Sequence, residues 1–235
     1  MAGWSPTPGR SRSSAKKASD RSAVRIRQHV NPLKSDLLDI ADVPRVEVPS
    51  GRALEVELGA AEAHFLIDRA RQDTASVFVG IEIRRELVEA VNAACAAAGP
   101  TNVRSVFANM SVDMGRLFAD GSVRRFFLNF PDPWFKSRQH KRRVIGPGLM
   151  VEIGRALAPG GELYVQTDIF ALALDAMAAL EGLAETSDAG FVNAAGAWTF
   201  LRESPYDAKS RRERQCESEG VRVWRLLYRR GGPSP

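Results

Sequence analysis

The most informative part of the sequence lies at residues 126–136, which read Phe126-Phe127-Leu128-Asn129-Phe130-Pro131-Asp132-Pro133-Trp134-Phe135-Lys136. The apolar run at its start predicts a buried strand. Two prolines follow two residues apart, and proline neither donates to a sheet ladder nor continues a helix interior. We therefore expect Asp132 on a stiff loop at the carboxyl end of a strand, where open α/β sheets bind their ligands.

A basic, aromatic segment follows this loop directly. Trp134 is succeeded by five Lys or Arg residues between positions 136 and 143. A carboxylate held beside an aromatic ring and a run of cations indicates a group that acts on a polyanion. The alternative interpretation is a proline-rich turn with a solvated basic face.

Outward from this loop, strands and helices alternate along the chain. Alternation of this kind predicts right-handed crossovers and a mostly parallel sheet that is covered on both faces, which is the α/β class. Two late strands are expected to form an antiparallel pair. The predicted strands are 53–58, 76–82, 103–108, 123–129, 162–167, 198–201 and 223–228, and the predicted helices are 61–72, 85–98, 147–157 and 170–181.

Charge divides the 235-residue chain into an arm and a body. Residues 1–34 carry eight Lys or Arg and one acid, whereas the whole chain has a net charge of +5, so the body is slightly negative. The arm is rich in Ser, Gly, Pro and Ala and is expected to be largely disordered. A basic arm commonly binds nucleic acid, and the alternative is a solubilising leader. The predicted organisation is an arm at 1–34, one domain at 35–230 and a short tail at 231–235.

The cysteines and the apolar runs of the sequence indicate in which cellular compartment the protein is expected. Cys95 and Cys216 lie far apart and form no CxxC pair, which fits a reducing cytoplasm and argues against a zinc site. We expect no bound metal. Neither a run long enough to span a membrane nor the apolar core of a signal peptide is seen, so we expect a cytoplasmic protein that does not associate with membranes.

Two strand ends predict a nucleoside site. The first strand ends at Gly59, and Glu82 ends the second strand 23 residues later. A carboxylate at this spacing hydrogen-bonds a ribose diol both in dinucleotide dehydrogenases and in methyltransferases that use S-adenosylmethionine. A pyrophosphate needs a glycine-rich turn, and here Ala61 and Ala63 occupy the other positions, which favours the methyltransferase. The alternative is an ordinary capped strand end.

Taken together, these residues resemble the bacterial, single-subunit tRNA (guanine-N7)-methyltransferases from about Arg25 to Arg229. The resemblance implies a Rossmann-like fold with a seven-stranded sheet, and methyl transfer from S-adenosylmethionine to N7 of a guanosine in the tRNA variable loop. It also implies action without an obligatory partner subunit. The matching motifs are the Asn129–Lys136 stretch with His140-Lys141-Arg142-Arg143, Arg27–Leu33, Gly80-Ile81-Glu82, Leu157–Leu163, Gln166-Thr167-Asp168, Ser210-Arg211-Arg212-Glu213 and Val223-Trp224.

The same resemblance assigns roles to individual residues. Asp132 is implied as the active-site acid, and it also lies by the cofactor. Trp134 is expected either to stack on a base or to pack its own loop. The implied cofactor contacts are Glu57, Gly59, Glu82, Asn109 and Asp132, and the implied tRNA contacts are Lys136, Asp168, Ser210 and Glu213. Methylation at N7 leaves the opposite edge of guanine free, and a carboxylate can accept from its N1–H and N2–H₂ groups. Glu213 is the candidate for this grip and Asp168 is the next; the alternative is that Glu213 only offsets the neighbouring arginines.

Three positions depart from the family pattern. The usual G-x-G-x-G loop is Gly59, Ala61 and Ala63, position 109 is Asn where many members have Asp, and the late T-x-x-E motif begins with Ser210. If the backbone at 61 or 63 needs a positive φ, alanine costs about 1 kcal/mol or more there. These departures leave a second hypothesis, a tRNA-binding protein on a methyltransferase fold that has lost turnover.

Overall fold

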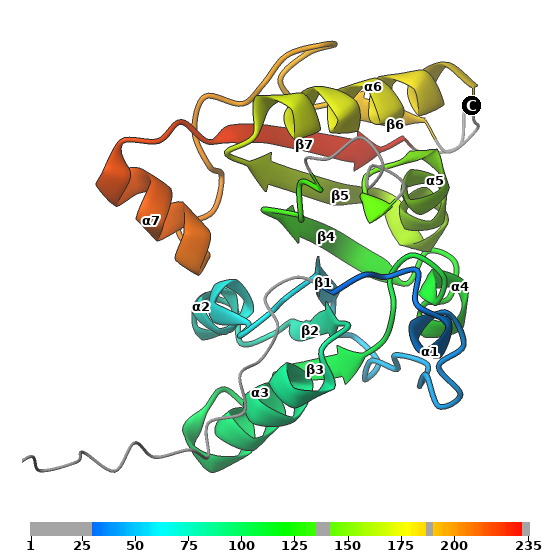
Figure 1. The fold of residues 1–235 in the computed structure, drawn as a ribbon, viewed down its shortest axis with the longest axis vertical. Helices are drawn as coiled ribbons and strands as arrows, with labels where there is room; N and C mark the ends of the chain where they lie inside the picture. Colours follow the sequence, from blue (N-terminus) through cyan, green and yellow to red (C-terminus); the bar gives the residue numbers. More distant parts are fainter. Residues whose placement is uncertain (1–29, 135–141, 187–189, 232–235) are drawn as a thin grey trace, which may run out of the picture.

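One mixed sheet organises the molecule. The structure is a computed structural model that describes residues 30–134, 142–186 and 190–231. Within these ranges seven strands form a single sheet in the order β3-β2-β1-β4-β5-β7-β6, and β7 runs opposite to β5 (Figure 1). The strands are β1 (Leu54–Leu58), β2 (Val77–Glu82), β3 (Val103–Phe107), β4 (Val123–Asn129), β5 (Leu157–Thr167), β6 (Phe191–Asn193) and β7 (Trp224–Arg230).

Helices cover both faces of the sheet. Successive residues of a strand point to opposite faces. On β4, Phe127 packs against Phe65 of α2 with ring centroids 4.8 Å apart, whereas Phe126 joins the cluster that contains Ile153 of α5. The described helices are α1 (Ser35–Leu38), α2 (His64–Gln72), α3 (Arg85–Ala98), α4 (Met114–Leu117), α5 (Pro147–Ala156), α6 (Phe170–Thr186) and α7 (Arg211–Glu219). This arrangement confirms the predicted α/β class and its mostly parallel sheet.

Most of the expected helices and strands are present, although β5 begins at Leu157 and not at residue 162, and the short helices α1 and α4 were not expected. The bounds of α3 and β4 are as predicted, and β7 is the predicted late strand. The expected strand at 198–201 is wrong, because that segment contributes only an isolated bridge between Leu201 and Arg225. The strand paired with β7 on its outer side is instead β6, and α7 was not predicted.

The N-terminal residues that are described pack against the domain. Residues 1–29, most of the predicted arm, lie outside the described ranges. Pro32 is buried, and its carbonyl oxygen accepts a hydrogen bond of 2.9 Å from the side chain of Asn109. Residues 30–34, assigned to the arm from sequence, therefore belong with the folded body. No helix among the described residues is long and apolar enough to cross a membrane.

Candidate active site

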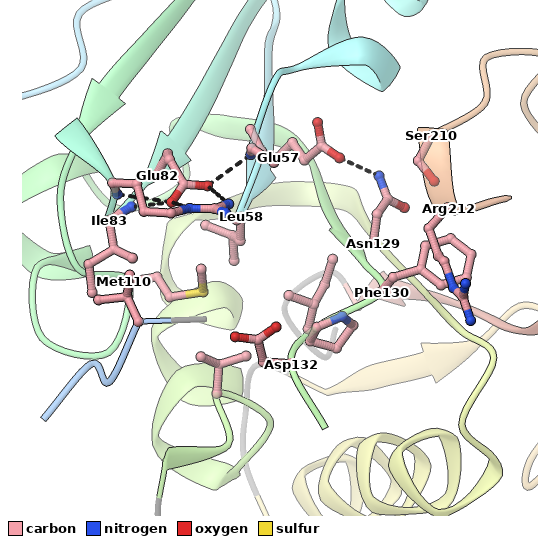
Figure 2. A pocket seen from close by; sticks show the side chains of 18 of the residues that line it. Glu57, Leu58, Glu82, Ile83, Met110, Asn129, Phe130, Asp132, Ser210 and Arg212 are labelled. Carbon is pink, nitrogen blue, oxygen red and sulfur yellow. Dashed lines mark hydrogen bonds and ion pairs between the residues drawn. The ribbon is translucent and has the colours of Figure 1, made fainter. Parts of the chain in front are cut away.

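A pocket opens beside β1, at the point where the order of strand addition changes from one side of the sheet to the other. From the central β1, the chain moves to β2 on one side and returns later to β4 on the other, and both pair with β1 in parallel. The carboxyl ends of such neighbouring strands diverge and leave a crevice. Here the crevice is a cavity of about 750 Å³ lined by the ends of β1, β2 and β4 and by Asp168, with Ser210 and Arg212 on the side of α7 (Figure 2). Its size is typical of a small-molecule site.

Glu57 is a buried carboxylate that forms no ion pair with any of the described residues. The Nδ2 of Asn129 donates to its Oε1 over 2.7 Å, and its Oε2 has no hydrogen-bond partner among the described residues. Burial raises the pKa of Glu57 to about 8; the hydrogen bond from Asn129 lowers it somewhat, and the negative charge of Glu82 raises it further. Because Glu57 lines the pocket, its unpartnered oxygen is suited to receive a cationic or hydrogen-bond-donating ligand group.

Glu82 is, by contrast, heavily bonded. The Arg84 guanidinium binds both of its oxygens at 2.8 and 2.9 Å. Backbone N–H groups of Ala61, Ile83 and Arg84 also donate to it, each over 2.9 Å. A carboxylate offers about four lone-pair directions, so a ribose diol bound at Glu82 would share or replace the contacts of Arg84.

The loop after β1 has the backbone shape that glycine favours, although two of its residues are alanines. Gly59, Ala61 and Ala63 have φ values of 78°, 48° and 55°. Ala63 is the N-cap position of α2, and the Ala61 N–H is held by Glu82. The condition under which alanine costs about 1 kcal/mol at each site is therefore met. The loop nevertheless has the left-handed backbone that the glycine pattern implies.

The loop that carries Asp132 is fixed at both ends. Phe130 and Trp134 have positive φ values of 48° and 41°, and they bracket the two prolines. The Phe130 N–H donates to the backbone oxygen of Gln166 over 2.8 Å, and the Arg143 guanidinium donates to the oxygen of Pro133 over 2.8 Å. Asp132 lines the pocket from this loop (Figure 2). Its expected position at the carboxyl end of a strand is what the structure presents.

Asn109 also lines the pocket, but its side chain is occupied by the protein. Its Nδ2 donates to the carbonyl oxygens of Pro32 and Leu37, both over 2.9 Å, and its Oδ1 accepts from the N–H of Ser111. Asn109 is 1% exposed. The side chain therefore holds the N-terminal segment against the end of β3. Its expected role as a cofactor contact stays a prediction.

Two of the expected tRNA contacts lie at the edge of the pocket. Asp168 follows β5 and binds the Arg212 guanidinium over 2.5 Å. Ser210 is the N-cap of α7, and its hydroxyl oxygen accepts from the Glu213 N–H over 3.1 Å. Helix capping thus explains Ser210 in structural terms, and the cap also presents Arg211 and Arg212 to the pocket.

The structure does not present Glu213 to a ligand, and its expected role as the group that grips guanine stays a prediction. It is 1% exposed and is not among the residues that line the pocket. Arg225 donates to its Oε1 over 2.9 Å, and Gln166 donates to its Oε2 over 3.0 Å. Both oxygens are engaged inside the protein, so a direct grip on guanine does not fit this geometry.

The basic segment is described only in part. Lys136, the remaining expected tRNA contact, lies outside the described residues, as do His140 and Lys141. The guanidinium of Arg142 lies 5.1 Å from the centre of the Trp134 ring, and both side chains line the pocket. No group of His, Cys, Asp or Glu residues suited to a metal ion is found in the described ranges.

Sequence reasoning missed three residues that shape this site. Asn129 and Gln166 were noted only as parts of motifs, yet they connect Glu57 to Glu213. Arg84 was not noted at all, and it covers Glu82. The position of Asn129 and Gln166, each at the last or next-to-last residue of a buried strand, is the signal that would have identified them.

The chain is similar to methyltransferases along most of its length. A family model described as "Putative methyltransferase" matches residues 52–226. The chain is 33% identical over 213 residues to a tRNA (guanine-N(7)-)-methyltransferase of Synechococcus sp. (strain JA-3-3Ab), covering 88% of this chain and 86% of the relative. It is 34% identical over 212 residues to a protein of the same description in Synechocystis sp. (strain ATCC 27184 / PCC 6803 / Kazusa). This match covers 88% of this chain and 98% of the relative.

Solved structures agree on the fold. The 16S rRNA methyltransferase KamB superposes with a TM-score of 0.53 at 14% identity, covering 77% of this chain and 88% of KamB. The [4+2]-cyclase SpnF superposes with a TM-score of 0.51 at 14% identity, covering 78% of this chain and 77% of SpnF. At these identities the likeness concerns the arrangement of the sheet and helices.

Proposed function

The chain belongs to the tRNA (guanine-N(7)-)-methyltransferase family, and from that premise we propose that it transfers a methyl group from S-adenosylmethionine to N7 of a guanosine in the tRNA variable loop. The observation that carries the proposal is the meeting of three acidic side chains, Glu57, Glu82 and Asp132, in one pocket at the switch point of the sheet. The proposal includes a cytoplasmic location. Cys95 and Cys216, both buried and free, support it.

The residues of the pocket fit the cofactor. S-adenosylmethionine carries a cationic amino group, a ribose diol and a sulfonium whose methyl group is transferred. Glu57 has an unpartnered buried oxygen that suits the amino group, and Glu82 ends β2 where a ribose diol is bound in this fold. The left-handed backbone of Gly59, Ala61 and Ala63 turns the chain sharply between them. We infer that these residues hold the cofactor.

The chemistry requires orientation and charge more than proton transfer. Guanine N7 has an in-plane lone pair, so no base has to deprotonate it before attack. Positive charge moves from sulfur to the purine during transfer, and a fixed carboxylate nearby stabilises that charge throughout. We infer that Asp132 has this task, and the two prolines that flank it, with the left-handed backbone at Phe130 and Trp134, support a loop of restricted conformation.

The basic and aromatic groups at the edge of the pocket support tRNA as the substrate. Arg212 is held by Asp168, and the Arg211 side chain is 78% exposed and lies 3.8 Å from Glu62. Exposed arginines of this kind position a nucleic acid through its phosphates. The stacked Trp134 and Arg142 offer a flat surface for a base. Lys136 is proposed as a further phosphate contact on the strength of the family motif alone.

The test is the substitution Asp132→Asn in a single-turnover methylation assay on tRNA. We expect the rate to fall by roughly 10²-fold or more, the usual loss when a key electrostatic group is neutralised. The matched control is Asp120→Asn, because Asp120 is 82% exposed, pairs with Arg155 and is absent from the pocket lining.

Mass spectrometry of nucleosides from the same tRNA identifies the product. The wild-type protein should yield 7-methylguanosine, mapped by digestion to the variable loop. Near-normal rates in Asp132→Asn would refute the role of that residue. A protein that binds tRNA but forms no methylated nucleoside would instead support the hypothesis of lost turnover.

A further inference from the structure

A buried chain of hydrogen bonds crosses the sheet from α7 to β1. Arg225 donates to Oε1 of Glu213, and Nε2 of Gln166 donates to Oε2 of Glu213 over 3.0 Å. The same Nε2 donates to Oδ1 of Asn129 over 3.0 Å. Finally, Nδ2 of Asn129 donates to Oε1 of Glu57 over 2.7 Å, the link drawn in Figure 2. The chain therefore connects the helix beside the pocket with a carboxylate inside it.

In this chain of hydrogen bonds, Glu213 decides which way each amide side chain donates. A carboxylate only accepts hydrogen bonds, and Oε1 of Glu213 already accepts one from the Arg225 guanidinium, which leaves Oε2 as an acceptor for Gln166. Gln166 must therefore turn its NH₂ group toward Glu213, and its second hydrogen then faces Asn129. Asn129 has to present its oxygen to Gln166, which leaves its own NH₂ group for Glu57. Reversal of either amide would bring two donors or two acceptors together.

We propose that Glu213 is a positioning residue that acts through Gln166 and Asn129 to orient Glu57. The chain keeps Oε1 of Glu57 engaged inside the protein and leaves Oε2 for the ligand in the pocket. The proposal rests on the proposed function, in which Glu57 receives the cationic amino group of S-adenosylmethionine. It replaces the direct contact between Glu213 and guanine that the sequence suggested.

Three members of this hydrogen-bond chain are buried, and the fourth, Asn129, is half-buried where it lines the pocket. Glu213 is 1% exposed, Gln166 is fully buried and Glu57 is 3% exposed. Hydrogen bonds are stronger away from water, and a buried group that loses its partner cannot recover it from solvent. Gln166 also accepts the N–H of Phe130 with its backbone oxygen, so the residue at the middle of the chain anchors the Asp132 loop as well.

The pKa of Glu57 shows whether the hydrogen bonds from Glu213 to Glu57 are intact. The hydrogen bond from Asn129 lowers the pKa of Glu57, against the rise that burial causes. Losing that bond should raise the pKa, whereas losing only the negative charge of Glu213 should lower it. The sign of the shift therefore separates the two effects. The other charged or titratable groups around the pocket are Glu82 with Arg84, Asp132, Glu62, His64, Arg142, Asp168, Arg211 and Arg212.

The experiment follows the Glu57 carboxyl by ¹³C NMR in the full-length, cofactor-free protein between pH 5 and 10. The variant Glu57→Gln assigns the signal. Two variants break the chain at different elements: Glu213→Gln on α7, and Gln166→Met on β5, which leaves the pair of Glu213 with Arg225 in place. Glu217→Gln is the control, because Glu217 lies on the same helix and pairs with Lys209 at the surface.

We expect the titration midpoint of Glu57 to rise by about half a unit or more in both chain variants, the shift expected when a carboxylate loses a hydrogen bond. Calorimetry with S-adenosylmethionine at pH 7.5 should show affinity reduced by about 5- to 10-fold. The control should match the wild type in both measurements.

An unchanged or lowered midpoint in Gln166→Met would overturn the proposal, even if Glu213→Gln fails to fold. So would a loss of stability in both variants with the midpoint and the affinity unchanged, since that would show a purely structural role. A wild-type protein that titrates as expected but does not bind S-adenosylmethionine would refute the proposed function and, with it, the role of the chain in cofactor binding.

Discussion

Two glutamates on β1, separated by one residue, occupy opposite electrostatic situations. Glu55 and Glu57 point to the same face of the sheet, and both are buried. Glu55 binds Arg69 over 2.9 Å and Arg125 over 2.6 Å. Glu57 receives one amide hydrogen and no cation, and its second oxygen has no partner among the described residues.

The difference separates a structural carboxylate from a functional one. Two guanidinium groups offset the loss of water around Glu55, so its place in the core is stable without a ligand. Glu57 lacks this compensation, and burial raises its pKa to about 8. A group left in such a state within a pocket is a candidate for binding or catalysis, because its partner arrives only with the ligand. The predictions below test this distinction.

The largest effect is expected from Glu55→Gln. The amide keeps one acceptor but turns an NH₂ group toward an arginine, so the half-buried guanidinium groups of Arg69 and Arg125 lose the buried carboxylate between them, although Arg125 keeps Glu162. The free energy of unfolding should fall by about 3–5 kcal/mol, the usual cost of breaking a buried ion pair. Urea denaturation at pH 7 measures it. The affinity of Glu55→Gln for S-adenosylmethionine under native conditions should equal that of the wild type. A loss of stability below about 1 kcal/mol would contradict the structural role of Glu55.

Glu57→Gln should change the pH dependence of stability. The folded protein keeps a proton on Glu57 up to about pH 8, whereas the unfolded chain releases it near 4.5. This raised pKa stabilises the fold below pH 4.5, and the contribution is lost as pH rises toward 8. The wild type should therefore lose about 1.4 kcal/mol per pH unit across that window relative to the variant. Urea denaturation at pH 5, 6, 7 and 8 tests this, and parallel stability curves would show that Glu57 is not held neutral.

The smallest effect belongs to the surface end of the Glu55 network. Arg229 contacts Glu162 over 3.1 Å and is 57% exposed, while Glu162 also keeps Arg125 over 2.7 Å. Arg229→Ala should cost less than about 1 kcal/mol, as exposed ion pairs do. The same urea series measures it. A loss as large as that of Glu55→Gln would mean that the network acts as one unit and not through its buried centre.

The sequence predicted the parts of the fold that depend on local pattern. Apolar runs and helix stops placed α3 and β4 at their observed bounds. The late strand at 198–201 was wrong because an aromatic, apolar run was read as a strand, whereas Trp198 has a φ of 56° and is 60% exposed. The real outer strand, β6, has only three residues, too few for any periodic signal.

The site was predictable where topology decides position. Glu57, Glu82 and Asp132 end parallel neighbours or follow them, so their convergence follows from the strand order. The hydrogen-bond partners were not predictable. Asn109 bonds the oxygen of Pro32, which is 77 residues away, and Gln166 bonds Glu213 across 47 residues. Such contacts depend on how remote segments pack, which a local pattern does not encode.

The two left-handed alanines after β1 bear on how such sites are recognised in other sequences. A glycine motif specifies residue types, whereas the feature present here is a positive φ angle at Ala61 and at Ala63. Alanine also has fewer conformations than glycine in the unfolded chain, which offsets part of its strain in the folded one. Searches that require the glycines would overlook proteins like this one. Searches that score dihedral angles at the turn after the first strand would retain them.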